Sequence, residues 1–249
     1  EQILFPATPD FRIDSMAFAG CTSLGEIVLP RYLSSLGSGC FFGCSNLRKI
    51  SISEDNASFC TDENGILFNK DQSTLLCYPA LCPLTAYTAE NTVSGIDGYA
   101  FAYAATLESV TLPETITTLS YSTFQNCTNL ASIYFYGNAP SIQYNTFKDT
   151  SSNLTLYYIE GKSGWTSPTW NGYNTATFVP GSVDPDPTVP GDIDGNGVLD
   201  YFDVSALYAA YLSGEVDAAA MDVNGDGVVD YFDAAKLYAA FRGTVSLGK

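Results

Sequence analysis

Residues 17–30 read Ala-Phe-Ala-Gly-Cys-Thr-Ser-Leu-Gly-Glu-Ile-Val-Leu-Pro, and the apolar positions of this stretch return every 23 residues. Phe18 is followed by Phe41, and Phe101 is followed by Phe124 and Phe147. The same interval relates Ile13 to Leu36, Leu24 to Leu47, Ile27 to Ile50, Val110 to Ile133, and Leu112 to Phe135. A fixed period of this length over residues 11–158 predicts stacked coils that share one continuous core, because a single coil cannot bury its apolar side alone.

Within each coil, successive side chains alternate between two faces, which predicts a short strand. In Ile27-Val28-Leu29 and in Val110-Thr111-Leu112 the first and third residues point to one face. Strands of successive coils then stack as a parallel sheet. The pattern A-F-x-G-C-[TS]-[SN]-L-x-x-I-x-L-P, clear at 17–30 and looser at 40–53 and 123–136, resembles the BspA-like leucine-rich repeats of bacterial surface proteins. The resemblance implies an α/β-type leucine-rich-repeat solenoid over residues 1–178, with short parallel strands and 23-residue coils.

One segment breaks the period. The interval from Ile52 to Ala89 is 37 residues, which is 14 more than one coil. Turn residues at 62–65 and 69–73 separate short apolar runs, so we expect a β-hairpin insertion near residues 57–83 that projects from the solenoid. We interpret it as a stabilising flap, with partner binding as the alternative.

The end of the solenoid needs a cap, since its last coil would otherwise expose the core. Residues 164–173 contain both tryptophans of the chain and fit that role; a sugar-stacking platform is the alternative. Residues 179–190 hold four prolines and form a predicted linker. The outward strand row is Val28, Ser51, Thr88, Thr111, Tyr134 and Tyr157. It suits a peptide or glycan and carries no catalytic charge cluster.

A twelve-residue pattern occurs twice in residues 191–249, beginning at Asp192 and at Asp222. Side-chain oxygens stand at positions 1, 3, 5, 9 and 12, glycine stands at 6, and position 7 offers its carbonyl, which is the spacing of a calcium loop. The predicted ligands of two calcium ions are Asp192, Asp194, Asn196, Val198, Asp200 and Asp203, and then Asp222, Asn224, Asp226, Val228, Asp230 and Asp233.

Each loop is followed by one helical run, over 204–213 and 234–242, and no helix pattern precedes the first loop. This duplicated loop and helix resembles the type I dockerin of cellulosomal proteins. The resemblance implies a small all-α calcium-binding module over residues 191–249 that binds a cohesin module of a scaffoldin. The residues it assigns to cohesin contact are Tyr201, Phe202, Tyr208 and Ala209, and their duplicates Tyr231, Phe232, Tyr238 and Ala239.

Composition excludes several functions. The formal charge is −17, which disfavours nucleic acid and anionic membrane surfaces as partners. No apolar run approaches the ~20 residues of a membrane span. The chain has no histidine, so Ser-His-Asp and Cys-His nucleophile systems and histidine-ligated zinc are excluded.

The cysteine count is odd, at seven. Cys21, Cys44 and Cys127 share one repeat position that faces inward in the leucine-rich repeats that the chain resembles. We therefore predict buried, unreactive thiols there and free thiols generally, with a Cys77–Cys82 disulfide as the alternative.

The dockerin resemblance implies a secreted component of a polysaccharide-degrading complex, free or attached to the cell surface, and we interpret this component as non-catalytic. The chain opens on Glu1 rather than Met, which we interpret as a removed signal peptide or a trimmed end. Two alternatives are an adhesin or inhibitor that acts through the concave solenoid face, and a polysaccharide hydrolase with an unrecognised site.

Overall fold

The computed structural model describes residues 3, 5, 8, 10–178, 203–207, 221–223, 228–229 and 231–241. The chain divides into two compact units, Glu1–Ala176 and Thr177–Lys249. Among the described residues, no helix has the length and apolar character that a membrane crossing requires. The predicted linker at 179–190 lies outside the described residues.

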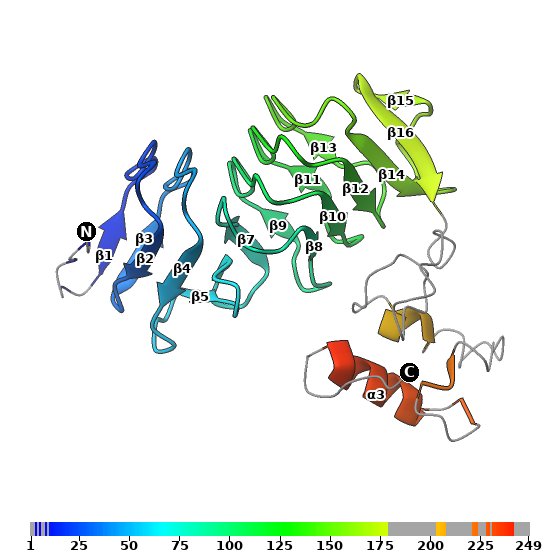
Figure 1. The fold of residues 1–249 in the computed structure, drawn as a ribbon, viewed down its shortest axis with the longest axis horizontal. Helices are drawn as coiled ribbons and strands as arrows, with labels where there is room; N and C mark the ends of the chain where they lie inside the picture. The colour runs from blue at the N-terminus through cyan, green and yellow to red at the C-terminus, as the bar shows by residue number, and fades with distance from the viewer. Residues whose placement is uncertain are drawn as a thin grey trace. The chain divides into compact units, whose positions relative to one another are not determined.

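The first unit is a solenoid of short strands joined by turns (Figure 1). Its strands are β1 (Phe11–Ile13), β2 (Glu26–Leu29), β3 (Leu33–Leu36), β4 (Lys49–Ile52), β5 (Phe59–Thr61), β6 (Leu67–Asn69), β7 (Thr74–Cys77), β8 (Ala86–Thr88), β9 (Gly95–Ile96), β10 (Ser109–Leu112), β11 (Thr118–Leu119), β12 (Ser132–Phe135), β13 (Ser141–Ile142), β14 (Thr155–Ile159), β15 (Thr169–Trp170) and β16 (Tyr173–Phe178). The predicted leucine-rich solenoid is confirmed.

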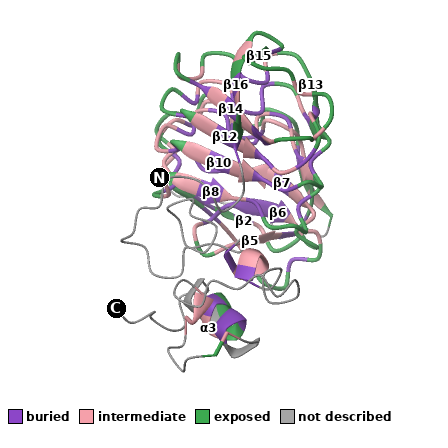
Figure 2. Ribbon diagram, turned by 90° about the vertical axis from the view of Figure 1, so that its right-hand side faces the viewer, coloured by how far each residue is buried: buried purple, intermediate pink, exposed green. Residues whose placement is uncertain are grey.

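Parallel pairing follows the sequence period. Val110 on β10 lies opposite Ile133 on β12, and Ile133 lies opposite Leu156 on β14, so each register step is one coil. One six-stranded sheet has the order β15-β16-β14-β12-β10-β8, whereas β2 and β4 form a separate two-stranded sheet. Figure 2 shows the strands of the larger sheet as successive rungs.

The predicted inward strand residues are buried, except that Ile52 on β4 is only partly buried. Ile27 and Leu29 are buried on β2, while Val28 between them is 68% exposed. Inside the solenoid the phenylalanine column forms an aromatic spine, with stacked pairs Phe18–Phe41, Phe101–Phe124 and Phe124–Phe147. Such stacking adds about 0.5–1.5 kcal/mol per pair beyond area burial.

The turns carry a second 23-residue regularity. Two residues per turn adopt positive φ, in one series Met16, Gly39, Tyr99, Ser122 and Asn145, and in the other Gly20, Gly43, Tyr103, Asn126 and Asp149. Successive turns are joined by backbone hydrogen bonds. The Phe18 N–H donates to the Cys40 carbonyl at 2.9 Å, and the Phe101 N–H donates to the Thr123 carbonyl at 2.9 Å. The residues with positive φ therefore orient each turn so that its backbone N–H groups reach the carbonyls of the next coil.

The insertion differs from the projecting hairpin that we predicted. Strands β5, β6 and β7 form an antiparallel meander, and β7 then pairs in parallel with β9 of the following coil. Ile66 and Leu67 on the meander are completely buried, in two different core clusters. The segment folds inward because its apolar residues face both neighbouring coils. It replaces part of one coil and joins two cores.

Hydrogen bonds tie the insertion to both sides. The Leu81 N–H donates to the Leu47 carbonyl at 2.8 Å, and the Tyr78 N–H donates to the Ala100 carbonyl at 2.7 Å. Buried Asn56 clamps its start. The Asn56 side-chain amide donates to the carbonyls of Arg31 and Leu33 at 2.9 and 3.0 Å, and its oxygen accepts the N–H groups of residues 58 and 59 at 2.8 Å each.

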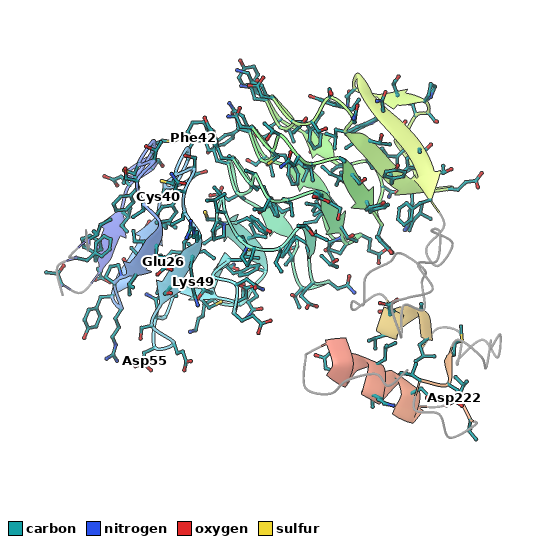
Figure 3. All side chains as sticks on the ribbon, in the orientation of Figure 1. Glu26, Cys40, Phe42, Lys49, Asp55 and Asp222 are labelled. Atoms are coloured by element: carbon teal, nitrogen blue, oxygen red, sulfur yellow. The ribbon has the colours of Figure 1, made fainter. Side chains whose placement is uncertain are left out.

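A small cavity of about 20 Å³ marks the seam between the N-terminal coils and the insertion. Cys40, Phe41 and Cys77 are among its lining residues. Figure 3 shows Cys40 and Phe42 on the turn that follows β3. On this turn the Phe42 ring packs against the rings of Tyr99 and Tyr103, at centroid distances of 4.7 and 5.3 Å. Aromatic contacts therefore close the seam where the parallel sheets are interrupted.

All seven cysteines are described and all are free thiols, so the Cys77–Cys82 disulfide is absent. Cys44 and Cys127 are buried as predicted, and burial raises their pKa values to about 11 and about 12. The prediction for Cys21 was wrong, because its side chain is exposed. Cys44 and Cys127 each donate their S–H to a carbonyl of the preceding coil, whereas Cys21 lies in the first coil of the described stack.

The tryptophan segment covers the far end of the core. The Trp165 ring stacks on Tyr158 with centroids 5.1 Å apart, and its Nε1–H donates to the Gly137 carbonyl at 3.3 Å. The Trp170 side chain is buried. The Trp170 ring is therefore enclosed, and one face of the Trp165 ring is covered by Tyr158. This is the packing of a cap, and it argues against the alternative of a sugar-stacking platform.

The second unit contains helix α3 (Tyr231–Phe241) and a helical turn at 203–207. Leu207 and Leu237 are completely buried in one small core, with partly buried Val204, Met221, Val223 and Val229 around it. Leu207 and Leu237 occupy the same position in the two sequence copies, so the described residues of the two copies share one core.

Candidate functional site

The calcium loops are described at four of the predicted ligand residues. Asp203 and Asp233, at position 12 of each loop, lie in helical segments, Asp233 as the third residue of α3, and both are completely buried. Asp222, at position 1 of the second loop, is partly buried, and Val228, at position 7, is 58% exposed. A residue that offers only its backbone carbonyl can leave its side chain in solvent, as Val228 does.

Burial of the two position-12 carboxylates fits a cation site. An ionised carboxylate taken out of water is costly unless it is hydrogen-bonded, paired or bound to a metal ion. Carboxylate and carbonyl oxygens are also the ligands that Ca²⁺ prefers. Bound Ca²⁺ would hold the loop closed and neutralise the acidic groups gathered in it. The other predicted ligands, Asp192, Asp194, Asn196, Val198, Asp200, Asn224, Asp226 and Asp230, lie outside the described residues.

The predicted cohesin-contact residues are described mainly in the second copy. Tyr238 on α3 is 45% exposed, one turn beyond buried Ala234 and next to buried Leu237. The backbones of Tyr231, Phe232 and Ala239 also belong to α3. Tyr201, Phe202, Tyr208 and Ala209 lie outside the described residues. Helix α3 therefore turns Leu237 inward and leaves Tyr238 accessible to a partner.

The second candidate surface is the outward side of the large solenoid sheet. Two columns run across β8, β10, β12 and β14 in register: Ala86, Ser109, Ser132 and Thr155 form one, and Thr88, Thr111, Tyr134 and Tyr157 form the other. The predicted outward row is the second column. The first column was not singled out from the sequence, although the 23-residue offset identifies its members.

Two tyrosines dominate this surface. The rings of Tyr134 and Tyr157 are nearly parallel, at 16°, with centroids 4.8 Å apart. Both side chains are half-buried, and burial raises the pKa of Tyr134, so its phenol stays neutral at physiological pH. On the two-stranded sheet the equivalent columns hold Glu26 and Lys49, which lie opposite each other, and Val28 and Ser51 (Figure 3).

Comparison with known families accounts for both units. Residues 1–63 and 77–163 match the BspA type leucine rich repeat region, in six copies. The chain belongs to the BspA-type leucine-rich repeat family. Residues 190–241 match the dockerin type I domain, so the BspA-type repeats are followed by a type I dockerin. Both families typically lack a catalytic site.

Solved structures similar to the BspA-type chain include two leucine-rich proteins and a pneumococcal antigen. One from Eubacterium ventriosum is 25% identical, with a TM-score of 0.43, and the match covers 55% of this chain and 42% of that one. A leucine rich cell surface protein from Faecalibacterium prausnitzii is 22% identical, with a TM-score of 0.48 and coverages of 68% and 55%. The pneumococcal vaccine antigen PcpA is 17% identical, with a TM-score of 0.42 and coverages of 68% and 59%.

The chain thus spans about half the length of these solved proteins. No curated protein matches it.

Proposed function

We propose that this protein is a non-catalytic, extracellular component of a polysaccharide-degrading complex, attached through calcium-dependent binding of its dockerin to a cohesin module of a scaffoldin. The dockerin match over 190–241 carries the proposal. The buried carboxylates of Asp203 and Asp233 support it, because each stands where a calcium loop meets its helix. The solenoid then presents its outward face to a protein or glycan ligand.

The two loops are proposed to bind one Ca²⁺ each and so to fold the module. Several anionic groups meet in each loop and repel one another without the cation, and the core around Leu207 and Leu237 is small. Tyr201, Phe202 and Tyr208, or their duplicates Tyr231, Phe232 and Tyr238, are proposed to contact the cohesin. Because the copies match at all three positions, the module can dock in two orientations related by half a turn.

Titration of the full chain with a type I cohesin, in excess calcium and in chelator, tests the attachment. Binding is expected in calcium only. The double variant Asp203→Asn, Asp233→Asn is expected to lose calcium binding measured directly by calorimetry, and cohesin binding with it. Asp149→Asn, which converts an exposed carboxylate on the solenoid to a carboxamide, is the matched control and is expected to behave as wild type. Equal cohesin binding in chelator would refute the calcium-dependent attachment.

The two-orientation interface has its own test. Tyr201→Ala with Phe202→Ala is expected to weaken cohesin binding little, because the second copy substitutes for the first. Adding Tyr231→Ala and Phe232→Ala is expected to abolish binding, as hot-spot aromatics each contribute about 2 kcal/mol or more. Complete loss from the first pair alone would rule out two orientations. Unchanged binding in the four-site variant would rule out the aromatic interface.

The hydrolase alternative gains no support from the two outward columns of the large sheet. Glycoside hydrolysis ordinarily needs two carboxyl groups held about 5–10 Å apart across the substrate. The two outward columns on β8, β10, β12 and β14 contain no carboxyl group. Absence of turnover with any polysaccharide that the full chain binds is the expected outcome.

A further inference from the structure

Lys236 on helix α3 is hydrogen-bonded to the start of the second calcium loop. Its Nζ donates to the carbonyl oxygen of Val223 at 3.0 Å, and the two residues are 13 positions apart in the chain. Lys236 is half-buried and lies in sequence between Ala234 and Leu237, which are both buried in the core of the second unit. Val223 packs against the same core. Helix α3 therefore holds Val223 both by its side chain and by its carbonyl.

This hydrogen bond joins the two ends of the predicted ligand set. Asp222, the predicted ligand at position 1, directly precedes Val223, and Asp233, the predicted ligand at position 12, comes three residues before Lys236. Figure 3 labels Asp222 in the second unit. A calcium loop must bring both ends onto one ion, and closing a flexible segment costs conformational entropy. The bond from Lys236 closes the same segment without using the ion.

The first copy lacks this lysine. The residue 30 positions before Lys236 is Ala206, whose side chain has no hydrogen-bond donor. The predicted side-chain ligands do not distinguish the two loops, since each set contains four aspartates and one asparagine. The lysine is therefore a difference between the copies that acts on closure of the loop and not on the charge of its ligands.

We propose that Lys236 is a positioning residue for calcium, which lowers the cost of closing the second loop and makes this loop the tighter of the two calcium sites. Preorganisation raises affinity because less ordering remains to be done when the ligand binds. An ammonium group also repels Ca²⁺, which acts in the opposite direction. That repulsion is the smaller effect, since Lys236 is only half-buried and water and salt screen its charge. The inference rests on the proposed calcium-dependent dockerin and deepens it.

Calorimetric titration of the calcium-free full chain with Ca²⁺ tests the proposal. Wild type is expected to bind two ions in two steps of different affinity. Lys236→Met removes the donor at a similar side-chain length. It is expected to weaken the tighter step about tenfold, as for the loss of one hydrogen bond from a charged group, and to leave the weaker step unchanged. Lys236→Arg keeps a charged donor and is expected to retain most of the affinity.

Two further variants assign the steps to the loops. Asp222→Asn in the second loop is expected to remove the tighter step, and Asp192→Asn in the first loop is expected to remove the weaker one. The reverse assignment would overturn the proposal, whether or not Lys236→Met folds.

Lys70→Met is the matched control. The Lys70 ammonium on the solenoid donates to the Glu54 carbonyl at 2.8 Å, which is the same kind of hydrogen bond in the other unit. This variant is expected to bind calcium as wild type does. Circular dichroism and cohesin titration in excess calcium show whether each variant is folded and attached.

The role of Lys236 is overturned by equal affinities of the two sites in wild type. It is also overturned if the tighter step is unchanged or becomes tighter in folded Lys236→Met, or if Lys70→Met weakens that step equally. These outcomes leave the calcium-dependent attachment intact. Absence of calcium binding in wild type would instead overturn the calcium-dependent dockerin and this inference together, so the two failures are distinguishable.

Discussion

The coils before the insertion and the coils after it share one 23-residue period, yet they differ in the size of their sheets and in how deeply the first coil is buried. In residues 10–56 the sheets have two strands each, and Cys21 is exposed. In residues 86–178 the main sheet has six strands, and Phe124, Cys127 and Leu130 are completely buried. The repeat specifies the shape of a coil, while position in the stack decides how much of it is buried.

The aromatic spine gives the strongest way to test this difference. Phe124 is completely buried between stacked rings of two neighbouring coils, whereas Phe18 at the same repeat position is partly exposed. Phe124→Ala is expected to cost about 3–5 kcal/mol of unfolding free energy, the range for a buried phenylalanine. Phe18→Ala is expected to cost less than half of that. Chemical denaturation measures both, and equal costs would mean that stack position has no influence.

Asn56 probes the junction between the two regions. Asn56→Ala removes four hydrogen bonds and leaves buried carbonyl and N–H groups without that partner. We expect a loss of about 3 kcal/mol, since each unsatisfied buried group costs about 1–3 kcal/mol and the site relaxes in part. Asn46→Ala is the matched control. Asn46 is exposed and donates one side-chain hydrogen bond, to the Thr22 carbonyl, so a change below about 1 kcal/mol is expected there.

The left-handed turn position tests what the two regions share. Gly43 and Asn126 hold equivalent positions, with φ of 74° and 61°. A Cβ on Gly43 would meet only ordinary contacts, the nearest at 3.5 Å, so Gly43→Ala is expected to cost about 1 kcal/mol for the backbone conformation alone. Asn126→Gly is expected to change stability by less than about 0.5 kcal/mol. A large loss in Asn126→Gly would show that the asparagine side chain, rather than its backbone, holds that turn.

Alkaline pH distinguishes a buried thiol of the later coils from an exposed thiol of the first coil. A thiol in an unfolded chain ionises near pH 8.5, while burial raises the pKa of Cys127 to about 12. Between these values the unfolded state has released its proton and the folded state has not, so rising pH favours unfolding. The stability is fully present below about pH 8.5 and declines up to about pH 12, by at most about 1.4 kcal/mol per pH unit for this group.

The Cys127→Ala variant is expected to show a shallower fall of melting temperature between pH 8 and pH 10 than wild type. Cys21→Ala changes an exposed thiol in the N-terminal coils and serves as the matched control, with a slope like that of wild type. Equal slopes for wild type and Cys127→Ala would contradict the assignment.

Periodicity was sufficient to predict the parallel sheet and its inward strand residues, because strand register in a solenoid equals the sequence period. It failed at two places where coils are not equivalent. Cys21 has the repeat identity of Cys127 but lacks a preceding coil among the described residues. The insertion was recognised by its extra 14 residues, yet local turn signals carry no information on whether Ile66 and Leu67 face solvent or a neighbouring coil.

The candidate sites divide in the same way. The calcium ligands were predicted from spacing within one loop, and two of them, Asp203 and Asp233, are buried in helical segments. The outward columns of the large sheet are made of residues 23 apart, such as Ser109 and Ser132, whose common surface is visible only once the coils are stacked in register.

Both tryptophans of the chain lie in the segment that covers the last coil, with Trp165 against Tyr158 and 4.8 Å from the Trp170 ring centroid. Intrinsic tryptophan emission is therefore a local optical probe of one end of the solenoid. If unfolding begins at this end, the tryptophan emission will shift before most of the circular dichroism signal is lost. If unfolding begins at β1, the emission will stay unchanged until the coil that contains β14 unfolds. Comparing fluorescence with circular dichroism therefore reports the direction in which the solenoid unfolds.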